Sequence, residues 1–173
     1  MLAEFTLDIP LLISRWIHIA AVVTAIGGAV FMRFALLPSA RDALSEESAA
    51  ELRAAVRRRW AKFVHAGIAL LLITGFFNFY VLAIKPGVDP VYHGFFGPKL
   101  LLALVVFFIA SGLVARSAGF AKMQAAGAKW FGVLLVLAGV IILLSGILNQ
   151  LRADSQRSLD AAPPAAEEVV ESP

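Results

Sequence analysis

The sequence contains no cysteine, only three methionines and only three histidines. The absence of cysteine excludes disulfides, iron–sulfur clusters, thiolate zinc sites and covalently attached c-type haem. Sparse methionine and absent cysteine also argue against high-affinity Cu(I) binding. The chain has no nucleotide-binding loop, no catalytic-triad motif and no carboxylate pair inside a hydrophobic run, so no soluble-enzyme signature is present.

Charge is scarce as well. Of the 173 residues, 16% are charged and 60% are hydrophobic, and the mean hydropathy is +0.84. Soluble domains are about 25% charged. The apolar residues form four runs of roughly 16–22 residues bracketed by charges, close to the ~20 needed to cross a bilayer. We therefore predict an all-α fold, a polytopic membrane four-helix bundle in a lipid bilayer.

The bundle is predicted over residues 1–150, with spans at about 10–37, 60–84, 98–116 and 129–150. Asp8 and Pro10 are typical of a helix start, and Pro98 is expected as the first helical residue of the third span. Residues 85–99, rich in proline and glycine, predict a turn-rich outer loop. Residues 151–173 are polar and then rich in Ala, Pro and Glu, which predicts a disordered polar tail.

The basic residues are distributed unevenly between the two sides of the bilayer. Ten lie in or beside the first and third loops and five lie on the other side. The positive-inside rule then places both termini outside, most simply at a bacterial inner membrane. This topology accounts for the net charge of +3 without a nucleic-acid partner. Residues 45–60 are rich in helix formers, and they predict a long cytoplasmic helical extension before the second span.

Polar residues inside spans are expected to face protein, because an unpaired polar group is costly in lipid. His18 lies near a stripe of small residues, so it is expected to face the bundle. By helical spacing and depth, His18, Asn78 and Lys99 converge on one outer pocket, joined by Ser145 and Asn149. His65 lies near the opposite edge, on the order of 20 Å from His18 along the membrane normal.

Three stretches of the sequence resemble a known family. They are "RWIHIAAVV…GG…LLP" (Arg15–Pro38), "ITGFFN" (Ile73–Asn78) and "GPKLLLALVVF" (Gly97–Phe107). Together they are similar to the copper-resistance D (CopD) domains and to the related HemJ-type membrane protoporphyrinogen oxidases. The resemblance covers roughly residues 10–150 and implies a four-helix membrane protein.

The HemJ-type enzymes carry a first-span histidine and a third-span lysine associated with b-type haem, and these match His18 and Lys99. They also tend to carry a later histidine in the third span, whereas Phe107–Arg116 contains none. The resemblance therefore implies haem binding more directly than oxidase activity.

Three functions follow as hypotheses. The first is a haem b-binding membrane redox protein, with His18 as axial ligand and Lys99 and Asn78 at a propionate or an anionic substrate. Any reaction would be oxidation of a tetrapyrrole or quinol, and enzymatic activity is left open. The second is a copper-resistance or copper-uptake protein, with His18 and His93 as metal ligands.

The third hypothesis is a non-catalytic assembly protein that packs partner helices, or a second copy of itself, on small-residue stripes. A passive role is also open for the individual residues. Histidine and lysine near a membrane interface can reach the headgroups without any function. Asn78 can serve as an interhelical hydrogen-bonding group.

Overall fold

The computed structural model describes residues 8–83 and 90–161. Its elements are α1 (Ile9–Phe31), the π-helical turn η1 (Met32–Leu36), α2 (Leu37–Ala43), α3 (Glu46–Ala83), α4 (Pro90–Val114), the 3₁₀ turn η2 (Ala118–Phe120), α5 (Ala121–Ala125) and α6 (Gly127–Ala161). Within the described ranges there is no strand. The predicted all-α class is confirmed.

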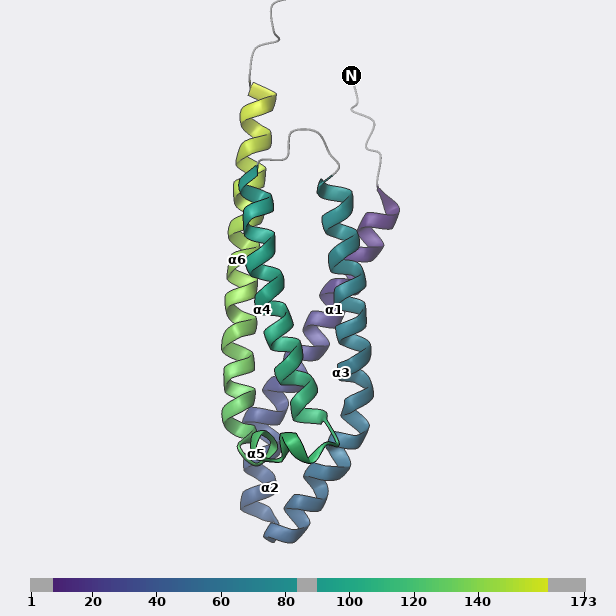
Figure 1. The fold of residues 1–173 in the computed structure, drawn as a ribbon, viewed down its shortest axis with the longest axis vertical. Helices are drawn as coiled ribbons and strands as arrows, with labels where there is room; N and C mark the ends of the chain where they lie inside the picture. Colours follow the sequence, from purple (N-terminus) through teal and green to yellow (C-terminus); the bar gives the residue numbers. More distant parts are fainter. Residues whose placement is uncertain (1–7, 84–89, 162–173) are drawn as a thin grey trace, which may run out of the picture.

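In the described part of the chain, the long helices α1, α3, α4 and α6 run roughly side by side (Figure 1). α1 packs against α3, α3 against α4, α4 against α6, and α6 against α1. We call the end where α1 begins and α6 ends the terminal end, at the top of Figure 1, and the end that holds α2 and α5 the loop end. Both described ends of the chain therefore lie at one end of the bundle.

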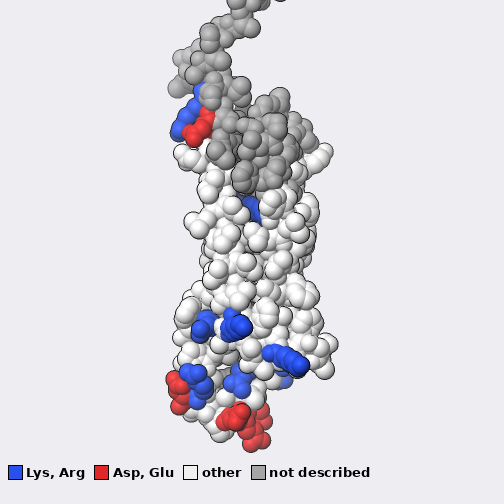
Figure 2. Space-filling model, turned by 60° about the vertical axis from the view of Figure 1, so that its left-hand side comes forward, with Lys and Arg blue, Asp and Glu red and all other residues white. Residues whose placement is uncertain are grey.

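The surface of the bundle is that of an integral membrane protein. Among the described residues, four helical segments are long and apolar enough to cross a membrane: Ile9–Ala43, Glu46–Val81, Gly97–Val114 and Gly127–Gln150. Large apolar side chains such as Val136 and Leu143 are 68% and 69% exposed. Figure 2 shows charged side chains gathered toward the ends and an almost uncharged middle. An apolar belt of this kind is stable against lipid, not against water.

Two predicted features of the helix boundaries are confirmed. Asp8 caps α1, because its carboxylate accepts a hydrogen bond from the Leu11 backbone N–H at 3.2 Å. The extension before the second span is helical and continuous with it, so that α3 runs for 38 residues from Glu46. Acidic residues in its first turn favour this start through the helix dipole.

Two boundary predictions are wrong. Pro98 lies inside α4, which begins at Pro90, so Pro90 is the first-turn proline and most of the expected loop 85–99 is helix. A proline costs a helix one hydrogen bond, but membrane helices tolerate it. The polar tail is not disordered from residue 151, because α6 continues to Ala161. An ion pair of 3.2 Å between Arg157 and Asp154 supports this extension. Residues 84–89 and 162–173 lie outside the described part.

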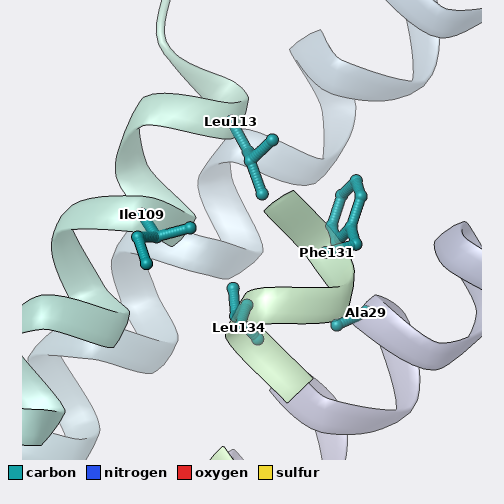
Figure 3. Packing of buried hydrophobic residues seen from close by; sticks show 5 residues of the cluster. All are labelled: Ala29, Ile109, Leu113, Phe131 and Leu134. Atoms are coloured by element: carbon teal, nitrogen blue, oxygen red, sulfur yellow. The ribbon is translucent and has the colours of Figure 1, made fainter. Parts of the chain in front are cut away.

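A hydrophobic core cluster lies near the loop end. Its buried side chains come from α1, α4 and α6 and are shown in Figure 3: Ala29, Ile109, Leu113, Phe131 and Leu134. Nearby, the Gln124 side-chain amide donates to the carbonyls of Gly112 (3.0 Å) and Ala115 (2.8 Å) and so satisfies the end of α4. The polar residues described next lie beyond this core, toward the terminal end.

Candidate functional site

His18 projects from α1 toward α3. Its Nδ1 lies 2.8 Å from the Thr74 hydroxyl oxygen, within hydrogen-bond distance. The imidazole is half-buried, and Nε2 makes no hydrogen bond to the described part of the chain. The prediction that His18 faces the bundle is confirmed, because its partner lies on another helix.

The residues of α3 that face His18 have small side chains, and a hydrogen bond within the helix holds one of them in place. Thr74 is 6% exposed, and its hydroxyl donates to the Leu70 carbonyl at 2.6 Å. Gly75 follows, and a Cβ built there would lie 3.6 Å from Cε1 of the imidazole. The absence of a side chain at Gly75 lets the ring lie close to the backbone of α3.

Lys99 reaches the same region from α4. Its side chain is half-buried and close enough to His18 for the two groups to interact electrostatically. The three residues share one depth: His18 follows Ile9 by nine residues, Thr74 precedes Ala83 by nine, and Lys99 follows Pro90 by nine. At ~1.5 Å per residue this is ~14 Å from the terminal-end tip of each helix. Three helices thus supply one polar layer.

Neither Lys99 nor Asn78 has its full complement of partners. In the described part of the chain no carboxylate is within ion-pair distance of Lys99. Asn78 lies one turn beyond Thr74 on α3, ~6 Å nearer the terminal end. Its Oδ1 is buried and accepts no hydrogen bond from the described residues. A cation without an anion and a buried carbonyl without a donor are both costly in a membrane.

Among the described residues, the other predicted members of this pocket make no hydrogen bond to His18. The Ser145 hydroxyl donates to the Ile141 carbonyl of its own helix at 2.6 Å, and Asn149 is exposed. His65 is exposed and precedes Thr74 by nine residues on α3, or ~14 Å along the helix axis. This distance is shorter than expected but still separates His65 from His18. His93 lies in α4, and its side chain is outside the described part.

Sequence reasoning missed Thr74 and Gly75 as members of the site. The available signal was their shared helical face with Asn78, since residues three and four apart lie together on a helix. The small residues of α1 that suggested a surface for partner helices are partly used within the chain. Ala21 and Ala29 are buried, and Gly28 packs against Trp60.

The chemistry of this layer is that of a single-histidine site with a nearby cation. Among the described residues no group of three or more His, Cys, Asp or Glu side chains is placed to hold a metal ion. One imidazole nitrogen can still serve a metal that arrives with its own ligands, as haem iron does. A lysine and an amide beside it suit the acidic groups that such a cofactor carries.

No protein-family model, curated protein or solved structure matches the chain.

Proposed function

We propose that the protein is an integral membrane haem b-binding redox protein with His18 as an axial iron ligand. The single observation that carries the proposal is the setting of His18: Nδ1 is held by Thr74 at 2.8 Å, whereas Nε2 is free of the described chain. Histidine ligands of metals usually engage their second nitrogen in this way. The resemblance to CopD domains and HemJ-type proteins independently suggests a ligand at this position.

Lys99 and Asn78 fit the remaining parts of the cofactor. The ammonium of Lys99, which has no carboxylate within ion-pair distance among the described residues, suits a propionate carboxylate or an anionic substrate. The buried, unsatisfied Oδ1 of Asn78 is an acceptor that a donor on a bound molecule could satisfy. The bound haem would supply one-electron transfer. His18 would hold the iron, and Lys99 would hold the acidic groups of the cofactor.

We place the polar layer in the outer half of a bacterial inner membrane, with both termini outside. This orientation follows from the excess of basic residues around the first and third loops. A redox partner or substrate there would be a quinol or a tetrapyrrole, which partition into lipid. The copper hypothesis is less favoured, since one imidazole supplies a single ligand and copper sites in proteins use several.

The test is the absorption spectrum of protein purified in detergent from haem-replete cells, with and without dithionite. We expect a Soret band that shifts on reduction. His18→Gln keeps polarity and approximate size but ligates iron poorly, so it should preserve folding and lose the band. His65→Gln is the matched control, because that exposed histidine lies away from the layer, and it should retain the band. Wild-type protein without a Soret band would refute the haem proposal.

A further inference from the structure

We propose that Thr74 is the positioning residue of this site: its hydroxyl accepts the Nδ1 proton of His18 and thereby makes Nε2 the nitrogen that carries the lone pair. The inference deepens the proposed function where it concerns iron, but the location of the proton is a property of the chain alone. It rests on two linked hydrogen bonds between α1 and α3.

The Thr74 hydroxyl has a single proton to donate. The Thr74 oxygen lies 2.6 Å from the Leu70 carbonyl oxygen. Two oxygens at that distance repel unless a proton lies between them, and a carbonyl oxygen has none to donate. The hydroxyl proton therefore points at Leu70 and is not available to His18.

The direction of the hydroxyl proton determines which nitrogen of the His18 imidazole is protonated. The contact of 2.8 Å between Nδ1 and the Thr74 oxygen is a hydrogen bond only if Nδ1 carries the proton, because the hydroxyl has already given its own. A neutral imidazole has one protonated nitrogen and one with a lone pair. Nε2 is then the free donor atom, and the hydrogen bond at Nδ1 also limits rotation of the ring.

The direction of the Thr74 hydroxyl proton is determined by the backbone of α3. The acceptor of the Thr74 proton is a backbone carbonyl one turn earlier in α3, so the hydroxyl direction is set by the helix and not by a mobile side chain. Thr74 is also 6% exposed, which excludes competition from lipid headgroups or water at the hydroxyl. The backbone of α3 thus determines which nitrogen of a histidine on α1 can bind iron.

Three variants separate this role from simple packing. Thr74→Val is nearly isosteric and removes the hydroxyl, whereas Thr74→Ser retains it. Thr24→Val is the matched control, since Thr24 on α1 also donates to the carbonyl four residues earlier, at 2.8 Å, but is exposed and has no histidine partner. Loss of a hydroxyl bonded to its own helix is common to the two valine variants, whereas loss of the histidine partner occurs only in Thr74→Val.

The first measurement needs no haem. ¹⁵N NMR of the ring nitrogens, in haem-free full-length protein in detergent at pH ~9, where an ordinary histidine is neutral, reports which nitrogen is protonated. The His18 signals are those lost in His18→Gln. We expect the Nδ1–H form in wild type, Thr74→Ser and Thr24→Val, and a shift toward the Nε2–H form in Thr74→Val. An Nε2–H wild type would overturn the inference.

The second measurement is haem titration of the same proteins. Loss of a partner that orients a metal ligand typically weakens binding ~10–100-fold, so we expect this for Thr74→Val and near wild-type affinity for Thr74→Ser and Thr24→Val. Unchanged affinity in Thr74→Val would overturn the positioning role. If wild type binds no haem, the proposed function fails, while the NMR result still decides the location of the proton.

Discussion

The indole ring of Trp60 on α3 occupies the place where a side chain at Gly28 on α1 would begin. A Cβ built on Gly28 would overlap Cζ2 of the indole. The same ring stacks on Phe63, with centroids 5.4 Å apart, which restricts its movement. Together with the hydrogen bond between His18 and Thr74, this contact fixes how α1 and α3 pair.

Substitution of Gly28 by alanine should therefore destabilise the bundle. Glycine to alanine in a helix normally gains up to ~1 kcal/mol. At Gly28 the new methyl overlaps a rigid ring, and overpacking of this kind costs ~1–3 kcal/mol. We expect a lower melting temperature of the detergent-solubilised protein, measured by circular dichroism.

Gly27 provides the control for this experiment, because a Cβ there meets no atom within 4 Å. Gly27→Ala should match or exceed the wild-type melting temperature. Adding Trp60→Leu to Gly28→Ala should recover part of the lost stability by removing the ring. A Gly28→Ala protein as stable as Gly27→Ala would show that the close approach of the helices is not formed.

Gly75→Ala should weaken haem binding several-fold without loss of stability. Its methyl would lie 3.6 Å from Cε1 of His18, an ordinary van der Waals distance, so the fold can accept it. Cε1 lies between the two ring nitrogens, and the methyl narrows access to Nε2. Gly67→Ala, with nothing within 4 Å, is the control. Equal haem affinity in the two variants would mean that haem approaches the imidazole from another side.

Lys99→Met should weaken haem binding by roughly 10–150-fold, since it retains the apolar stem and removes a charge-assisted interaction worth ~1.5–3 kcal/mol. Haem dimethyl ester, which lacks free carboxylates, makes the test specific. Wild type should prefer haem over the ester, and Lys99→Met should lose that preference. Lys129→Met, which alters an exposed lysine on α6, should keep it. A preference that survives in Lys99→Met would place the propionates elsewhere.

Cysteine accessibility tests the orientation. The chain has no native cysteine, so each introduced thiol reports alone. Asp154→Cys, near the end of α6, should react with an impermeant maleimide added to intact cells, whereas Ser45→Cys, between α2 and α3, should react only after lysis. The reverse labelling would place the termini and the His18 layer on the cytoplasmic side.

Much of the fold could be predicted from the sequence. Apolar runs of bilayer length identify the spans, because a membrane helix must satisfy its backbone internally and present apolar side chains to lipid. The cap at Asp8 and the long α3 follow from local residue preferences. Local residue preferences gave the wrong start for α4, because both Pro90 and Pro98 suit the first turn of a helix and the helix begins at Pro90. They also gave the wrong end for α6, because the polar residues after 150 continue the helix to Ala161.

For the site, the sequence by itself determined that His18 and Lys99 lie within spans on the same side of the membrane, since helical rise sets depth. Only the tertiary structure decided their partners. Helical periodicity gives the direction of a side chain about its own axis, but not which neighbouring helix lies opposite or at what register. That arrangement is set by packing such as Trp60 on Gly28, and it brought Thr74 to within hydrogen-bond distance of His18.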